Sequence, residues 1–476
     1  MWGLKISIVK LRYLLNFYLI VVYLPGVFHE GAWSDDYAAL LEPNSVGMHA
    51  LRDSRPVYGA TINLFYSLFG TVQELSFIRL FGLLGLILLC NELCLRFEKL
   101  PNGISLMIFT TFALTLPSFQ FSAHWAIAYA MSWSGYMALY GFRLFSNTNL
   151  NFRLLGLLFL ILSLLTYPLV TFILFSVVFI EGLLFKETVS QLLKRLLKPF
   201  LFISLGIPVS YFLSLILMYS QNVSPNPRVS LVSVEQVPEK IIWFVTRPWA
   251  LSFRPFLINS PSVNEAVIWV ILGCLLILSL LILYYKSLST ALRVFCLFCF
   301  VLTLSVLPLL FTSQNQTDVR FLGSNTFLVL IVILFLSFNR LSSICFERPR
   351  RSLVYTGALV LVLFGFWSVN DRYSHFIKPI FQENLSFISS ELKGCDYTSK
   401  TLRIEVIQRE LPWGIKPLLG FYSQESDFES DWVPLAAVTA YAKSNRIYPK
   451  EVILLPSIES SKGGCQIFLD NYGRNS

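Results

Sequence analysis

The sequence has 476 residues, of which 55% are hydrophobic and only 14% charged, and its formal net charge at pH 7 is +9. Soluble domains carry roughly 25% charged residues, so this composition excludes an ordinary soluble enzyme. Apolar runs of about 20 residues, the length that spans a bilayer, recur as far as position 369 and predict a polytopic α-helical membrane protein.

The positive charge follows membrane topology and gives no reason to expect a nucleic-acid partner. The segments that we interpret as cytoplasmic are 1–12, 96–102, 143–153, 186–198, 285–293 and 339–351. Together they hold 17 lysines and arginines but only three acidic residues. This asymmetry is typical of the positive-inside rule and places the N-terminus in the cytoplasm.

Eleven apolar segments are expected to cross the membrane. In chain order they are 9–28, 75–95, 103–121, 124–142, 153–167, 168–185, 199–219, 263–284, 294–312, 322–338 and 352–369. We expect the first to be retained, because no small-residue cleavage site follows it. An odd number of spans places the C-terminal tail outside the cytoplasm, so residues 1–369 form the predicted transmembrane module.

Two long loops are expected on the outer face, at 29–74 and 220–262. Within the first, the apolar segment 56–70 is too short to cross a bilayer, so we expect it to lie in the outer interface. Within the second, 234–246 is predicted to form a short interfacial helix.

The tail, residues 370–476, is predicted to be a small extracytoplasmic α/β domain. Alternating apolar residues at 402–406 predict a strand, as do 452–455 and 466–469, and 431–444 is predicted to be a helix. If the tail is extracytoplasmic, Cys395 and Cys465 either pair as a disulfide or stay reduced. No cysteine spacing resembles a zinc or haem site, so no metal is expected on that ground.

Asp35 and Asp36 are the leading candidates for catalysis, because they are adjacent carboxylates at the start of the first outer loop. An ionised carboxylate about 3 Å from an acceptor hydroxyl can act as a general base. Capping is the alternative: Ser34 could cap a short helix near Tyr37, with both acids at its positive end. The two interpretations are compatible, and we expect at least one carboxylate to act on a substrate.

Arg52 and Arg55 follow in the same loop, and their forked guanidinium donors suit a phosphate or pyrophosphate group. An ion pair with Asp53 or with the Asp35–Asp36 pair is the alternative, as is contact with lipid headgroups.

Two further outer residues are candidates for binding a donor phosphate. Arg320, between two late spans, could reach a lipid phosphate or pair with Asp318. His124, in a tight outer turn, could donate a hydrogen bond to the phosphate or serve only the structure.

The arrangement resembles the membrane-embedded GT-C glycosyltransferases, which use polyprenyl-phosphate-linked sugars. Ser34-Asp35-Asp36-Tyr37 followed by Ser54-Arg55-Pro56 is most similar to the bacterial glucosyltransferases that decorate O-antigen, the outer glycan of lipopolysaccharide. The resemblance implies a protein of the bacterial inner membrane, surrounded by membrane lipids. It also implies an inverting transfer of a sugar such as glucose from the polyprenyl-phosphate carrier to a glycan or lipid-glycan acceptor.

In this family the carboxylate matching Asp35 or Asp36 would activate the acceptor hydroxyl. Arg55 and Arg320 would stabilise the charge that grows on the leaving phosphate. Some members use a divalent cation near the acid pair, and the sequence leaves that open.

Two other functions remain as alternatives. A secondary transporter or flippase of a lipid-linked glycan usually keeps ionisable groups near the bilayer midplane, whereas no predicted helix centre here carries a charge. An O-antigen ligase or polymerase tends to keep its key residues in a large late loop, whereas the sharpest cluster here comes first.

Overall fold

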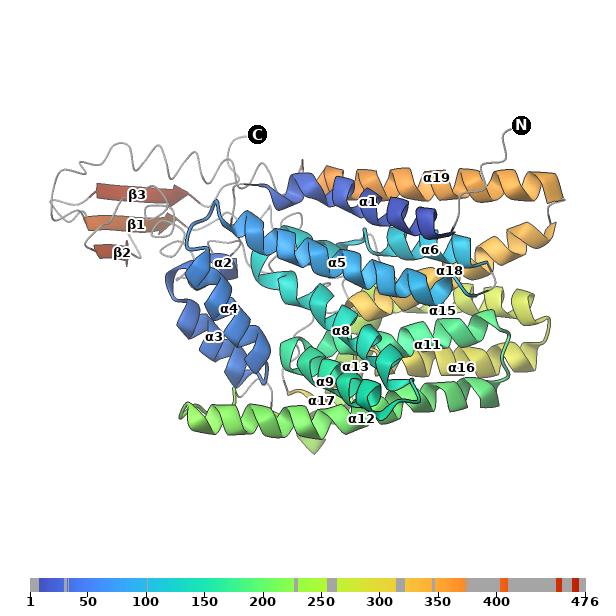
Figure 1. The fold of residues 1–476 in the computed structure, drawn as a ribbon, viewed down its shortest axis with the longest axis horizontal. Coiled ribbons are helices and arrows are strands. Elements are labelled where there is room, and N and C mark those ends of the chain that lie inside the picture. The colour runs from blue at the N-terminus through green and yellow to red at the C-terminus, as the bar shows by residue number, and fades with distance from the viewer. Residues whose placement is uncertain are drawn as a thin grey trace.

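The computed structural model describes residues 8–29, 32, 34–100, 102–226, 230–254, 263–313, 322–344, 347–372, 374, 403–409, 451–455 and 465–470. Over these residues the chain forms a bundle of long helices, with three short strands at one end (Figure 1).

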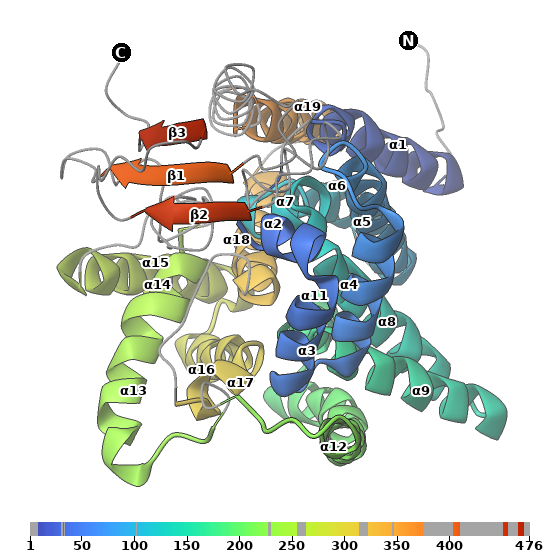
Figure 2. The same cartoon turned by 90° about the vertical axis from the view of Figure 1, so that its left-hand side faces the viewer.

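The N-terminal part combines two membrane-length helices with three short ones. They are α1 (Ile8–Val27), α2 (Ser34–Leu41), α3 (Pro43–Arg52), α4 (Pro56–Leu68) and α5 (Leu75–Phe97). Proline occupies the first position of α3 and of α4, where its missing N–H removes no intrahelical hydrogen bond. The three short helices fill the predicted first outer loop and gather at one end of the bundle (Figures 1 and 2).

The middle of the chain contains several interrupted helices. They are α6 (Gly103–Ala113), α7 (Pro117–His124), the 3₁₀ turn η1 (Ala126–Tyr129), α8 (Ala130–Phe145), α9 (Leu150–Thr166), α10 (Pro168–Thr171), α11 (Ile173–Leu184) and α12 (Val189–Ser220). The segment 103–121, predicted as one span, is bent by 63° between α6 and α7. Pro117 begins α7, and the residue before a proline is disfavoured in helical conformation, which accounts for the break.

The later part begins with short helices in the second long loop and ends with four longer ones. The elements are η3 (Val234–Gln236), α13 (Val237–Phe244), η4 (Val245–Trp249), α14 (Ala250–Ser252), α15 (Val263–Tyr285), α16 (Leu288–Leu304), α17 (Leu307–Phe311), α18 (Gly323–Ile344) and α19 (Glu347–Arg372). The predicted span 294–312 is therefore divided between α16 and α17, with proline near the start of α17.

The expectation of eleven membrane-spanning helices is not confirmed. Among the described residues, five helices are long and apolar enough to cross a membrane, and six if α6 and α7 form one bent span. The shorter apolar helices are Leu150–Thr166, Pro168–Leu184, Leu288–Leu304 and Thr356–Asp371. At about 1.5 Å per residue, even 17 residues rise only roughly 25 Å, which is less than a hydrocarbon core of about 30 Å.

The helices divide into a buried centre and an apolar periphery. Within the most apolar 18-residue stretch of each helix, 61% of the residues of α5 and 67% of those of α18 are buried. The corresponding shares are 22% in α1, 22% in α12 and 17% in α15. The outer helices therefore present many large apolar side chains on the surface, as expected for helices that face lipid.

Three strands lie at the end of the molecule where α2–α4 lie (Figures 1 and 2). β1 (Arg403–Arg409) pairs in parallel with β2 (Glu451–Leu455) and β3 (Cys465–Asp470), in the order β2-β1-β3. These positions agree with the three predicted strands. The predicted helix at 431–444 and Cys395 lie outside the described residues, so the complete α/β domain and the disulfide stay predictions.

Candidate functional site

The two adjacent aspartates lie in the first turn of α2 but in different surroundings. Asp36 is fully buried, and its Oδ1 accepts hydrogen bonds from the Tyr66 hydroxyl at 2.5 Å and from the Ile127 backbone N–H at 2.9 Å. Asp35 is half-buried, and no hydrogen bond or ion pair to it is found within the part of the chain that the structure describes. The carboxylates are therefore not equivalent.

Asp36 joins three separate elements. Its partners come from α4 and from η1, while the aspartate itself belongs to α2. Burial, and next the negative charge of Asp36, raise the pKa of Tyr66 well above its ordinary value, so this hydroxyl stays a donor. The two hydrogen bonds to this buried carboxylate stabilise the packing of α2 against α4 and η1, because loss of either donor would leave its negative charge poorly compensated.

The Ile127 backbone also forms a hydrogen bond with α4 directly. Its N–H donates to Asp36, and its carbonyl accepts a hydrogen bond of 2.8 Å from the Tyr58 hydroxyl. Burial raises the pKa of Tyr58 well above its ordinary value, Arg55 opposes that rise and Asp35 adds to it. Asp35 and Arg55 therefore both lie within electrostatic range of the same buried tyrosine.

Arg55 is held in one position from several sides. Its Nη2 donates to Asp53 Oδ2 at 2.5 Å, and its side chain is 21% exposed. The guanidinium carbon lies 5.3 Å from the ring centroid of Tyr58 and 5.4 Å from that of Tyr167. The ion pair with Asp53 is the alternative that the sequence left open. A guanidinium has five N–H donors, so one bond to Asp53 is compatible with further binding to a phosphate.

A tight turn creates the Asp53–Arg55 pair. Ser54 has φ of 61°, in the left-handed region that non-glycine residues seldom occupy. The backbone N–H of Ser54 donates to Leu51 and that of Arg55 to Ala50, which closes the end of α3 just before Pro56 starts α4. The turn brings an acid and a cation two residues apart onto the same side.

The remaining predicted residues are placed differently. Arg52 Nε donates to the Ser224 carbonyl at 3.1 Å, and the Arg52 carbonyl accepts from the Asn226 N–H at 2.9 Å. These contacts tie the first long loop to the second. Arg320 lies outside the described residues, so its role in binding the donor phosphate stays a prediction.

His124 lies fully buried at the end of α7. Its ring packs edge-on against Tyr23 at 5.3 Å, and a Cβ on Gly26 would stand 2.3 Å from its Nε2. Its carbonyl oxygen lies 3.1 Å from Nε2 of His29. These contacts join α1 to α7 and favour the structural alternative, while the predicted contact with a donor phosphate stays untested.

Sequence reasoning missed the tyrosines of this site. Tyr58 and Tyr66 are eight residues apart, a spacing that places both on one face of a helix, so periodicity could have paired them. Tyr167 gave no such signal, because it stands inside an apolar run and reaches Arg55 only through the break before α10.

No metal site is assigned. Within the described ranges, no group of three or more histidine, cysteine, aspartate or glutamate residues is arranged to hold a metal ion.

Comparisons with known proteins add one weak structural likeness. No protein-family model matches the chain, and no curated protein matches it significantly in sequence. Among solved structures, the chain is similar to the crystal structure of ArnT from Cupriavidus metallidurans bound to undecaprenyl phosphate. The identity is 13%, the match covers 92% of this chain and 89% of that one, and the TM-score is 0.42. A likeness at this level carries no argument about the function of this chain.

Proposed function

We propose that this protein is a GT-C-type membrane glycosyltransferase, which moves a sugar, with glucose as the first candidate, from a polyprenyl-phosphate carrier to a glycan or lipid-linked glycan at the outer face. The observation that carries this proposal is that two adjacent carboxylates differ in burial and in hydrogen bonding. Asp36 is buried and bonded twice, whereas Asp35 is half-buried and lies within electrostatic range of Tyr58, the ring against which the anchored Arg55 packs.

Asp35 is the proposed general base. The acceptor hydroxyl oxygen attacks the anomeric carbon of the donor sugar while Asp35 takes the hydroxyl proton. The bond between that carbon and the carrier phosphate oxygen breaks, and its electron pair leaves with the phosphate. One displacement of this kind inverts the configuration at the anomeric carbon.

Arg55 is the proposed partner of the leaving phosphate. Its position is fixed by Asp53, Tyr58 and Tyr167 before any substrate arrives, so little reorganisation is needed when negative charge develops. Asp53 also neutralises part of the charge of Arg55. We propose that the Arg55 guanidinium is therefore held ready to donate hydrogen bonds to the phosphate, while its net attraction for the product phosphate stays weak enough for release.

The test compares two substitutions one residue apart. Asp35→Asn keeps the size of the side chain but removes the base, so we expect sugar transfer to fall by roughly 10²- to 10⁴-fold with an unchanged melting temperature. Asp36→Asn should lower the melting temperature and activity together, because it weakens the tie among α2, α4 and η1. The measurement is release of polyprenyl phosphate from radiolabelled glucosyl polyprenyl phosphate, with membranes supplying the acceptor.

Two outcomes would contradict the proposal. Transfer by Asp35→Asn at the parental rate would show that Asp35 is not the base. Gradient-driven accumulation of the lipid-linked sugar in vesicles, without transfer, would identify a transporter instead.

A further inference from the structure

A second polar site lies at the opposite end of the bundle from Asp35. It is a cavity of about 400 Å³, within the range of about 300–1,000 Å³ typical of small-ligand sites. Its charged lining residues are Arg96, Glu181, Glu187, Lys194, Arg195 and Lys198. Arg96 stands 17 residues beyond Arg79 on α5, a rise of roughly 25 Å, and Arg79 contacts His29 near the aspartate end. The proposed transfer reaction therefore does not use this cavity.

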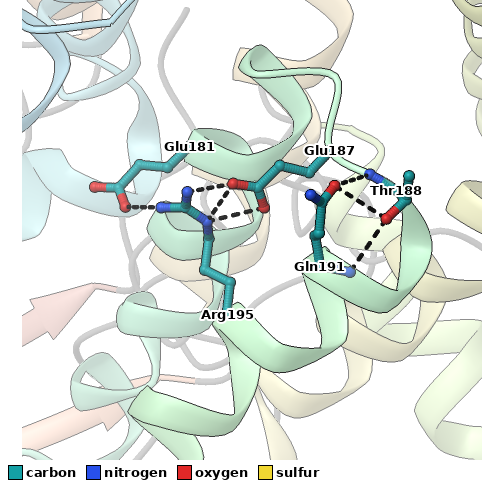
Figure 3. A network of polar contacts seen from close by, with 5 residues as sticks. All are labelled: Glu181, Glu187, Thr188, Gln191 and Arg195. Carbon is teal, nitrogen blue, oxygen red and sulfur yellow. Dashed lines mark hydrogen bonds and ion pairs between the residues drawn. The ribbon is translucent and has the colours of Figure 1, made fainter.

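An ion-pair network forms the wall of the cavity (Figure 3). Arg195 Nε lies 3.0 Å from each carboxylate oxygen of Glu187, and its Nη1 lies 3.5 Å from Glu181. Arg96 Nε lies 3.3 Å from the other oxygen of Glu181. The two carboxylates are thus engaged by the two arginines, and the pairs lock α5, α11 and α12 together.

A helix cap sets the direction in which α12 leaves this network. Thr188 and Gln191 form a reciprocal capping box at the start of α12, drawn beside the ion pairs in Figure 3. Only four residues separate the end of α11 from the start of α12, so the first turns of α12 must return past Glu181. The cap therefore places the basic residues of α12 at the cavity.

Lys194 and Lys198 leave a surplus of positive charge. They stand one turn apart on α12, both are exposed, and neither has an ion pair within the described residues. The cavity lining holds four cations and two carboxylates, a formal excess of two positive charges. Like charges four residues apart on a helix repel each other. A bound anion would reduce this repulsion between Lys194 and Lys198, which the carboxylates of the described residues do not neutralise.

An apolar surface borders the two lysines. Leu193, Leu197 and Leu201, which recur every four residues along α12, are each 50–52% exposed. The helix has 32 residues, about 48 Å, so its first turns extend beyond a hydrocarbon core of about 30 Å. At the edge of the hydrocarbon core, exposed leucines can pack against the acyl chains of a lipid while the neighbouring lysines contact its headgroup.

We infer that this cavity binds the phosphate of an anionic phospholipid, held by Lys194 and Lys198, with its acyl chains along the leucine row of α12. Free inorganic phosphate shares the headgroup chemistry but gives the apolar row no role. In the proposed orientation this lipid belongs to the cytoplasmic leaflet, where anionic headgroups bind basic pockets between helices.

The test uses the purified full-length protein in detergent, with melting temperature as the readout. Phosphatidylglycerol is titrated into the parent and into the double variant Lys194→Gln/Lys198→Gln. The matched control is Lys99→Gln/Lys286→Gln, which removes two exposed lysines that do not line the cavity. We expect the concentration of phosphatidylglycerol that gives half of the thermal shift to rise roughly 30-fold in the first variant and to stay at the parental value in the control.

Two further titrations separate the sources of phosphate. Phosphatidylcholine, which has no net charge, and inorganic phosphate should each leave the parent's melting temperature unchanged. A lysine-dependent shift with inorganic phosphate equal to that with phosphatidylglycerol would overturn the lipid assignment. An equal response of both double variants to phosphatidylglycerol would overturn the site itself. Neither result depends on glycosyl transfer.

Discussion

At the scale of single residues, the site is defined by how differently the fold treats similar groups. Asp35 and Asp36 have the same chemistry in isolation, yet two hydrogen bonds hold only Asp36. Arg55 likewise differs from Arg52, because two aromatic rings and Asp53 hold its guanidinium, whereas Arg52 joins two loops. A substitution at Asp36 should therefore act on stability first, and one at Asp35 on chemistry alone.

Replacing Tyr66 with phenylalanine tests the structural tie to Asp36. The substitution removes the 2.5 Å hydrogen bond and leaves a buried carboxylate with one donor fewer, which should cost roughly 1–3 kcal/mol. Thermal denaturation in detergent would measure the loss, with Tyr219→Phe as a control because Tyr219 is exposed. Equal melting temperatures for the two variants would contradict a structural role for the Tyr66–Asp36 bond.

His29 should make stability depend on acid. Burial, and next the charge of Arg79, hold the pKa of His29 well below its ordinary value, so the folded protein keeps this ring neutral. Below about pH 6.5 the unfolded chain binds a proton that the folded chain does not, so stability is lost as pH falls through that value.

His29→Gln removes this contribution while keeping a side-chain N–H near the position that faces the His124 carbonyl. We expect melting temperature measured from pH 7 to pH 5 to fall less steeply in the variant. The free energy of unfolding of the parent should fall, relative to that of the variant, by at most about 1.4 kcal/mol for each pH unit below 6.5. Parallel pH profiles would show that His29 takes up its proton in the folded state.

At the scale of elements, the segment that carries the candidate site depends on a close contact between α3 and α4. A Cβ on Gly59 would stand 2.3 Å from the carbonyl oxygen of Gly47, and a Cβ on Gly47 would stand 2.8 Å from that of Gly59. Gly59 also donates its N–H to the carbonyl of Arg55, one turn earlier. The spacing of these two helices therefore sets where the guanidinium lies.

Gly59→Ala should separate α3 from α4. Alanine favours a helix by about 1 kcal/mol over glycine, but overpacking against backbone typically costs roughly 1–3 kcal/mol. We expect a lower melting temperature together with weaker donor use, measured as a higher KM for the lipid-linked sugar. Gly357→Ala is the matched control, because a Cβ there meets no atom within 4 Å. A stabilised Gly59→Ala variant would contradict the close contact.

At the scale of the whole molecule, the two polar sites occupy opposite ends of one bundle. α2–α4 and the strands gather at one end, and the connection between α11 and α12 lies at the other (Figure 1). The basic segments predicted to be cytoplasmic include the start of α12, which lines the cavity. The positive-inside rule therefore predicts that Asp35 and Lys198 lie on opposite faces of the membrane.

Cysteine labelling would test this arrangement without any assay of activity. In a background that lacks the native cysteines, Asp35→Cys should react with an impermeant maleimide added outside intact cells. Lys198→Cys should react only after the membrane is opened. Labelling of both positions from the same side would contradict the proposed topology.

The sequence by itself determined the class of protein and the neighbourhood of the candidate site. Hydropathy and the distribution of lysine and arginine are local properties, so they predicted membrane helices, the first outer segment and the Asp35–Arg55 cluster. Strand positions in the tail were predicted for the same reason, because alternation of apolar residues is read over a few positions.

The tertiary structure decided which carboxylate is bonded and where the helices break. The Tyr66 and Ile127 partners of Asp36 are 30 and 91 residues away in the chain, and Tyr167 contacts Arg55 from beyond the six α-helices α4 to α9, so no local pattern could reveal them. The cavity lined by Lys194 and Lys198 likewise exists only because α5, α11 and α12 converge. Such properties depend on which distant segments pack together, and hydropathy carries no information about that choice.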